Sequence, residues 1–380
     1  MDEVWWPLNG PATYGEDIPL FSHMDWYISS LKENRPHDLS HSGLQYDWSQ
    51  IIDEIGGLSD LLVHPEFDGV DLRELVAERE NIDPTRVVVT QGVTDAIHLA
   101  LSAALPKDAK KVAVEVPAYA PVCHSARLIG LETVEFERII DGNGAWRLDR
   151  DRLSEIIPEV DGIIFTPILN PTGFRILTDD LEWLVEATRM EGIPLLADEV
   201  YDDSMRESED YSPLYLHGEH CVSMNSLTKV YGLGALRFGW IIANKEVAAR
   251  AHTAFQTMNG MVAIPSARIA MAVWPHLDDT LEAINSRRKQ SLPLLEELLQ
   301  KHGIEWQAPP YGLFGAINVG CDGKRLIDGI GKEEGLLAVP GCMFHKDLNN
   351  WIRIAWSSDS RTFAKDLLVL DKVLSRRNEV

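Results

Sequence analysis

The sequence contains little cysteine and no long apolar run. Its four cysteines, Cys123, Cys221, Cys321 and Cys342, lie far apart, without the paired spacing of metal sites or redox motifs. We therefore expect reduced thiols and no metal site. No apolar run approaches the roughly 20 residues that span a bilayer, and the start, MDEVWWPLNG, lacks the basic and apolar stretches of a signal peptide. A cytoplasmic location is expected.

Basic residues are also in short supply. Lys and Arg number 35 against 59 Asp and Glu, which gives a formal net charge of −24. This charge repels nucleic-acid backbones and anionic lipid surfaces, so neither nucleic acid nor a membrane is an expected partner. Any anionic ligand must be held by local positive groups that act against the overall field.

Short β-branched runs alternate with amphipathic stretches between about residues 86 and 243. This alternation is typical of strand–helix–strand units around a mostly parallel sheet that is covered on both faces. Apolar residues recur at the helical spacing in 94–105 and 178–190, and Thr178 followed by two aspartates predicts the start of the second helix. Seven strands are expected, at 86–90, 111–116, 133–137, 162–166, 193–198, 221–226 and 238–243.

The chain changes character beyond about residue 285. The segment SLPLLEELLQKHG predicts a helix that ends at Gly303, and shorter strands are expected in 315–319 and 351–356. Because 380 residues exceed what one hydrophobic core usually serves, two domains are expected. The division predicted is a large α/β domain over 46–285 and a smaller α+β domain built from 1–45 and 286–380.

Lys229 is the strongest chemical signal in the sequence. In SLTKVYGLGALRFGW, Ser226 precedes Lys229 by three residues and Arg237 follows it by eight. A lysine at a strand end can form an imine while a neighbouring hydroxyl and arginine hold an anion. Taken alone, Lys229 would more simply be one of many surface lysines, so its sequence context decides.

That context resembles the class I/II aminotransferases, which are fold type I enzymes that use pyridoxal 5'-phosphate. Their signature is Ser-x-x-Lys followed by a small-residue loop and Arg-x-Gly, which Lys229, Arg237 and Gly239 match, whereas Ala235 stands where glycine is usual. The resemblance covers roughly residues 60–360. It implies the cofactor bound as an imine on Lys229, and a three-layer large domain with a mostly parallel seven-stranded sheet beside a smaller α+β domain. Further motifs occur in the family's order, namely TQGVTDAI, VPAYAP, NPTG, ADEVY and WIRIAW.

The resemblance assigns the cofactor ring to four side chains. Asp198 would keep the pyridine nitrogen protonated, so that the ring accepts electrons from the bond that breaks at the α-carbon. Asn170 and Tyr201 would donate hydrogen bonds to the ring's phenolic oxygen, and Tyr119 would stack on the ring. A packed core tyrosine is the simpler alternative for Tyr119, and a rim aromatic is the alternative for Tyr201.

The cofactor phosphate and the substrate carboxylate would be bound by separate groups. The phosphate would lie at a helix N-terminus, and the arginine in WIRIAW would grip the α-carboxylate through both of its terminal nitrogens. The segment DLSHSGLQ would cover the substrate, with its glycine allowing close approach. The residues implied are Gly92, Val93, Thr94, Ser226 and Arg237 for the phosphate, and Arg353, Asn170 and Gly43 for the substrate.

His64 departs from the family. Many relatives have a tyrosine at this position that reaches the phosphate of the neighbouring subunit. The resemblance therefore implies a homodimer in which His64 reaches the neighbouring site and donates to phosphate with a pH-dependent charge.

These assignments imply transfer of an amino group between an amino acid and a 2-oxo acid, with Lys229 as general base. The same cofactor cradle also serves carbon–sulfur β-lyases, decarboxylating or cyclising relatives, and regulators that bind the cofactor without catalysis. The donor and acceptor stay open. The aromatic residues Trp5, Trp6, Tyr14, Trp26 and Tyr27 either line an apolar substrate pocket or pack at a dimer interface.

Overall fold

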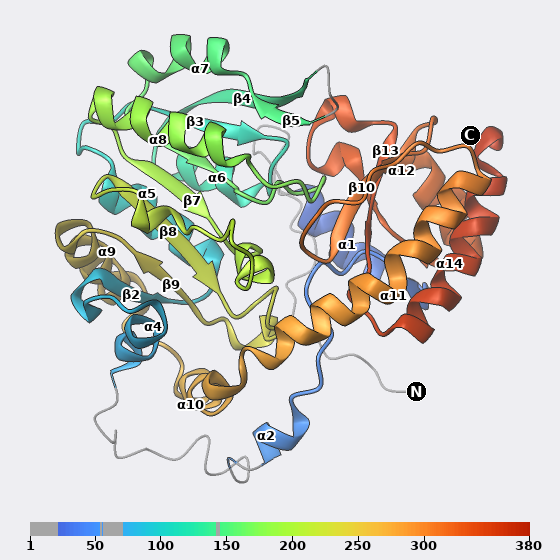
Figure 1. Cartoon of the computed structure of the whole chain (residues 1–380), viewed down its shortest axis with the longest axis horizontal. Coiled ribbons are helices and arrows are strands. Elements are labelled where there is room, and N and C mark those ends of the chain that lie inside the picture. Colours follow the sequence, from blue (N-terminus) through green and yellow to red (C-terminus); the bar gives the residue numbers. More distant parts are fainter. Residues whose placement is uncertain (1–21, 54, 56–70, 142–144) are drawn as a thin grey trace.

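The computed structural model contains a large sheet with its covering helices and, beside it, a second group of helices with two small sheets (Figure 1). It describes residues 22–53, 55, 71–141 and 145–380. His64, Trp5, Trp6 and Tyr14 lie outside the described residues.

The helices of the described chain are α1 (Ser22–Leu31), α2 (Ser49–Asp53), α4 (Leu72–Glu80), α5 (Val93–Ala104), α6 (Pro121–Leu128), α7 (Arg150–Ile156), α8 (Thr178–Glu191), α9 (Lys245–Asn259), α10 (Ile264–Val273), α11 (Asp279–Lys301), α12 (Gly323–Leu326), α13 (Lys332–Glu334) and α14 (Ser360–Ser375). Its strands are β1 (His37–Asp38), β2 (Val87–Thr90), β3 (Lys111–Val116), β4 (Glu132–Ile140), β5 (Trp146–Leu148), β6 (Ile163–Phe165), β7 (Leu195–Asp198), β8 (Cys221–Ser226), β9 (Gly239–Ile242), β10 (Phe314–Asn318), β11 (Leu336–Leu337), β12 (Val339–Pro340) and β13 (Trp351–Ala355).

The large sheet has the strand order β2-β9-β8-β7-β6-β3-β4-β5. The neighbours from β8 through β4 are parallel, whereas β9 is antiparallel to both β2 and β8, and β5 is antiparallel to β4. All seven predicted strands are present. The expected strand number was wrong by one, because β5 has only three residues and is too short to show a pattern in the sequence.

Alternate residues of the central strands enter two separate apolar cores. In β3, Val112 and Val114 join the core that contains α5, whereas Ala113 joins the core that contains α7 and α8. Leu196 and Leu195 of β7 divide in the same way. Because successive strand side chains point to opposite faces, helices cover both faces of the sheet. The predicted three-layer architecture is confirmed.

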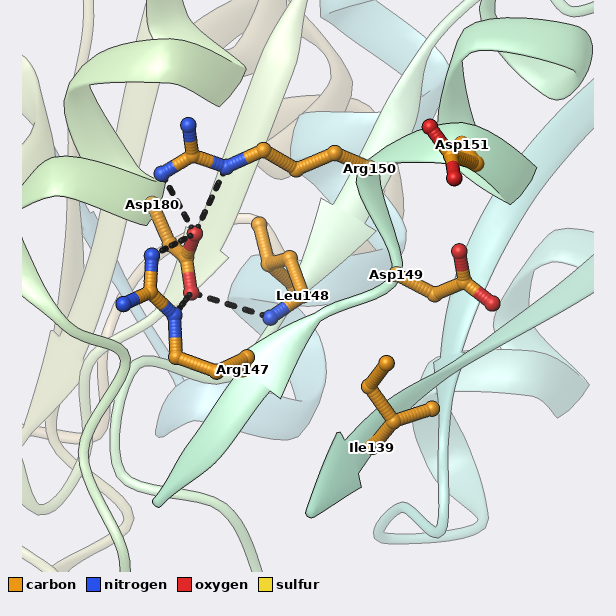
Figure 2. A pocket seen from close by; sticks show the side chains of 7 residues that line it. All are labelled: Ile139, Arg147, Leu148, Asp149, Arg150, Asp151 and Asp180. Atoms are coloured by element: carbon orange, nitrogen blue, oxygen red, sulfur yellow. Dashed lines mark hydrogen bonds and ion pairs between the residues drawn. The ribbon is translucent and has the colours of Figure 1, made fainter. Parts of the chain in front are cut away.

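The edge strand β5 is fixed to α8 by a buried carboxylate (Figure 2). Asp180 accepts hydrogen bonds from the Leu148 amide at 3.0 Å and from the Nε atoms of Arg147 and Arg150 at 2.9 and 2.8 Å. The helix α8 starts at Thr178 as predicted, but its N-cap is Leu177 and no side chain caps it. Thr178 is therefore the first residue of α8, as the sequence predicted, and not its N-cap.

The second group of elements joins both ends of the described chain (Figure 1). β1 pairs in parallel with β11, and β10, β13 and β12 form an antiparallel sheet that includes both strands predicted after residue 303. α11 runs from the large sheet to this group and packs against α14. Within the described residues, no helix combines the length and apolar character needed to cross a membrane.

Candidate active site

The predicted site residues gather where the parallel strands of the large sheet end. Asp198 is the last residue of β7 and Ser226 the last of β8, while Gly92 follows β2 by two residues. Tyr119 and Asn170 lie on the loops after β3 and β6. These residues are far apart in the sequence, but the strands that carry them end at the same edge of the sheet. The carboxyl edge of an open α/β sheet is the usual place for a ligand.

Lys229 lies three residues beyond β8, and its amine faces this edge. Its Nζ donates a hydrogen bond to Ser42 Oγ at 3.3 Å, and within the described chain it forms no ion pair. Burial, with further contributions from Arg353 and Arg237, lowers the pKa of Lys229 from 10.5 to about 8, against the opposing attraction of Asp198. Lys229, Asp198, Arg237 and Arg353 thus share one electrostatic environment.

Asp198 is buried beneath this site with 2% of its surface exposed. Its Oδ1 accepts a hydrogen bond from the Val200 amide at 3.2 Å. Burial raises the pKa of Asp198 from 3.8 to about 7, although the Val200 hydrogen bond and the charge of Lys229 act in the opposite direction. No cation in the described ranges lies at ion-pair distance from this carboxylate, so it is available to a ligand.

A positively charged cradle lies at the N-terminus of α5. Gly92 caps the helix with φ 84°, and a Cβ there would lie 2.8 Å from Arg237 Nη2. Arg237 has a left-handed backbone with φ 50°, and its Nη2 donates to the Gln91 carbonyl at 3.3 Å. Val93 and Thr94 begin the helix, where backbone N–H groups lack helical partners. Helix N–H groups and a guanidinium in one place suit an anion such as phosphate.

Ser226 and Tyr119 border this cradle. Ser226 is fully buried and pairs across the sheet with Gly239, where a Cβ would lie 2.8 Å from Gly92 Cα. Tyr119 forms a side-chain hydrogen bond with Thr94, which lowers the pKa of Tyr119 in part, although burial raises it overall. Both residues therefore lie beside the start of α5.

Arg353 of β13 enters the site from the second group of elements. Its Nη1 donates to Asn170 Oδ1 at 3.0 Å and its Nη2 to the Ser40 carbonyl at 2.6 Å. The guanidinium carbon lies 5.5 and 5.2 Å from the ring centroids of Phe314 and Phe344. The buried Nε has no hydrogen-bond partner among the described residues. Arg353 is therefore held rigidly and keeps donor capacity for a carboxylate.

Tyr201 connects the site to residues 38–45, the segment DLSHSGLQ, which we call the N-terminal loop. Its hydroxyl lies 2.9 Å from Ser42 Oγ, and its ring meets Phe314 edge-on at 4.7 Å between centroids. Burial raises the pKa of Tyr201 to about 12. In the same loop, a Cβ at Gly43 would lie 3.2 Å from the Thr228 carbonyl and 3.6 Å from Lys229 Cα, so the loop backbone packs directly against the lysine.

Sequence reasoning missed Ser42 and His41 in this loop. Ser42 contacts Lys229 across 187 positions of sequence, and no local pattern reports a contact of that range. His41 is near enough for the charge of Lys229 to act on it, and burial together with that charge lowers the pKa of His41 to about 4. The imidazole is therefore neutral near pH 7.

Residues 30–364 match the sequence model of the aminotransferase class I and II family. The chain belongs to this family. Similar proteins include aromatic-amino-acid aminotransferase 2 of Thermococcus litoralis, 24% identical over 333 residues that cover 83% of this chain and 85% of that protein. The aspartate aminotransferase of Pyrococcus abyssi is 24% identical over 334 residues, covering 82% and 84% of the two chains. The predicted family is confirmed, and with it an enzyme of the transferase type.

Two solved structures have the same fold as this aminotransferase. An aminotransferase from Mycobacterium tuberculosis superposes with a TM-score of 0.81 at 20% identity, covering 94% of this chain and 97% of that one. A PLP-dependent aminotransferase from Streptococcus suis gives 0.82 at 20% identity, covering 95% and 99%. At this identity the likeness bears on the fold. The family match and the PLP-dependent structure together show that the cofactor of this aminotransferase is pyridoxal 5'-phosphate.

The side chains of the aminotransferase fit this cofactor. Lys229 and Asp198 are charged groups in a buried site without ion-pair partners in the described chain, whereas proteins normally pair such charges. An aldehyde suits the amine, a protonated ring nitrogen suits the carboxylate, and a phosphate suits the cradle of Gly92 and Arg237. One ligand therefore satisfies three separate groups.

The lowered pKa of Lys229 predicts how the apo-aminotransferase takes up its cofactor. Imine formation requires the neutral amine, whose fraction increases about tenfold per pH unit below the pKa and then levels off. Because the pKa is about 8 rather than 10.5, we expect the uptake rate to level off just above pH 8. Stopped-flow absorbance of the forming imine measures this rate, with N-acetyl-lysine as the reference amine. A rate that keeps increasing to pH 10, as for the reference, would contradict the assignment.

Proposed function

We propose that this aminotransferase moves the substrate proton with Lys229, while Asp198 and Arg237 hold the cofactor and Arg353 holds the substrate. The observation that carries the proposal is the convergence of these four side chains on one edge of the sheet, where the charges of the other three all act on the Lys229 amine. A buried amine with a pKa of about 8 is suited to accept and return a proton near neutral pH.

In the proposed arrangement, each polar part of the cofactor has its own partner. When bound, pyridoxal 5'-phosphate supplies an electron sink for the bond that breaks at the substrate's α-carbon. Asp198 keeps a proton at the ring nitrogen, while Tyr119 packs at the ring. Asn170 and Tyr201 donate to the phenolic oxygen, and for Asn170 the amide nitrogen serves because Oδ1 already accepts from Arg353. The phosphate is held by Gly92, Val93, Thr94, Ser226 and Arg237.

Arg353 and the N-terminal loop define the substrate position. Arg353 binds the α-carboxylate with its remaining N–H groups, and Asn170 and the Ser40 carbonyl keep the guanidinium in place. The loop at Gly43 covers the substrate and limits access of water. Lys229 Nζ would take the proton from the substrate's α-carbon on a fixed face and return it on the same face, and water would release the first 2-oxo acid while its amino group stays with the cofactor. The reverse sequence converts a 2-oxo acid into a new amino acid.

We also propose that the enzyme is a cytoplasmic homodimer in which His64 reaches the phosphate in the neighbouring subunit. Its domains would be 46–285 and the combination of 1–45 with 286–380, and the later boundary would fall inside α11. The pairing of β1 with β11 supports this grouping of the two chain ends.

A panel of amino donors with 2-oxoglutarate and pyruvate tests the proposed reaction. We expect at least one donor to bleach the imine absorption of the purified enzyme, and an added oxo acid to restore it while a new amino acid forms. A cysteine conjugate is the matched substrate for elimination. Release of ammonia and pyruvate from that conjugate, with no new amino acid from any pair, would indicate a β-lyase instead.

A further inference from the structure

Ser42 is held against Lys229 by the backbone of the N-terminal loop. The Leu44 amide donates to the Lys229 carbonyl at 2.7 Å, and a Cβ at Gly43 would lie 3.2 Å from the Thr228 carbonyl. On the other side of the loop, a Cβ at Gly232 would lie 2.3 Å from the Leu44 carbonyl oxygen. The loop is therefore packed between two parts of the segment that carries the lysine, and Ser42 has little freedom to move.

The Ser42 hydroxyl contacts two reactive side chains at once. It accepts a hydrogen bond from Lys229 Nζ at 3.3 Å and lies 2.9 Å from the Tyr201 hydroxyl, with 4% of the residue exposed. Ser42 is the hydrogen-bond partner of the amine in the described chain. In the proposed function the base is the amine of Lys229, so the orientation of this nitrogen matters for proton transfer.

A neutral lysine amine has two N–H bonds and one lone pair. When one N–H bond points at Ser42, the lone pair cannot point at Ser42 and has fewer directions left to it. A hydroxyl can accept from the amine and donate to Tyr201 in the same geometry. Ser42 thus removes rotational freedom from the atom that must meet the α-proton, and preorganisation of this kind speeds proton transfer.

We propose that Ser42 is a positioning residue that orients the free amine of Lys229 for proton transfer. The proposal rests on the proposed role of Lys229 and adds to it a hydroxyl from the N-terminal loop. The packing of this loop against the lysine segment would then also set the geometry of the base. No atom of Ser42 joins or leaves the substrate.

Ser42→Ala tests the proposal in the holoenzyme. In a single half-reaction at saturating amino donor, we expect the rate to fall about tenfold, and the isotope effect of an α-deuterated donor to increase because proton transfer becomes slower than the other steps. The donor's KM and the cofactor content should change by less than about twofold. A loss of packing alone would not raise the isotope effect.

Two further variants separate the hydroxyl from its volume. Ser42→Thr keeps the hydroxyl and should restore most of the rate, while Ser42→Cys keeps the size but accepts hydrogen bonds weakly and should behave like Ser42→Ala. An unchanged rate and isotope effect in Ser42→Ala would overturn the proposal, as would a Ser42→Thr variant as slow as Ser42→Ala. Turnover without Lys229 would instead overturn the proposed function, so the two failures are distinguishable.

Discussion

Replacing Lys229 with alanine is expected to abolish both the imine absorption of the enzyme and its turnover. The variant removes the nitrogen that binds the cofactor aldehyde and the base that moves the α-proton, and the proton transfer alone contributes on the order of 10²–10⁴ to the rate. The combined loss brings activity close to the uncatalysed background. Single-turnover assays with purified cofactor and donor measure it, because they do not depend on steady-state release.

Lys229→Arg is the matched control for this experiment. It keeps a positive charge near Asp198 but cannot form an imine, and its guanidinium stays protonated. We expect it to be as inactive as Lys229→Ala, which would show that the amine is required rather than the charge. The phosphate cradle is untouched, so both variants should still bind cofactor non-covalently, as equilibrium dialysis would report. Transamination retained in Lys229→Ala would refute the assignment.

The fold could be predicted well where its strands lie in the middle of the sheet. Runs such as KVAVEV and IPLLAD are apolar because both faces of β3 and β7 are covered, and that pattern is visible without a structure. The edge strand β5 was not predicted, because Trp146–Leu148 has only three residues and lies at the edge of the sheet, where a strand has a neighbour on one side only. α11 begins 12 residues before the predicted segment at Ser291, because charged residues in 279–290 hide its helical period.

Residues that carry a motif could be predicted, including Arg353 from the second group of elements, whereas Ser42 belongs to no specific motif and could not. Asp198, Ser226 and Lys229 end or follow strands, so their place at the carboxyl edge follows from the topology. Ser42 lies in a loop whose path depends on β1 pairing with β11, a contact between the two ends of the described chain. No pattern in the sequence near Ser42 predicts that pairing.

Asp198→Asn is expected to retain the cofactor and lose most of the activity. The amide has the shape of the carboxylate but no charge, so it cannot keep the ring nitrogen protonated. Removing one preorganised electrostatic group typically lowers kcat about 10²–10³-fold. Absorbance of the bound cofactor reports occupancy, and half-reaction kinetics report the rate. An unchanged rate would show that the carboxylate does not face the ring.

The stability of the apoenzyme tells this electrostatic loss apart from misfolding. The pKa of Asp198 is about 7 in the folded apoprotein and 3.8 in the unfolded chain. As pH rises, the unfolded chain therefore loses this proton at a lower pH than the folded protein does. The contribution of Asp198 to folding is therefore fully present below pH 3.8 and is lost as pH rises through 7. Asparagine has no such dependence. The apo variant should melt at or above the wild-type temperature at pH 8, and this advantage should shrink toward pH 4. A variant that melts lower than wild type at pH 8 would mean that Asp198 serves the fold rather than the cofactor.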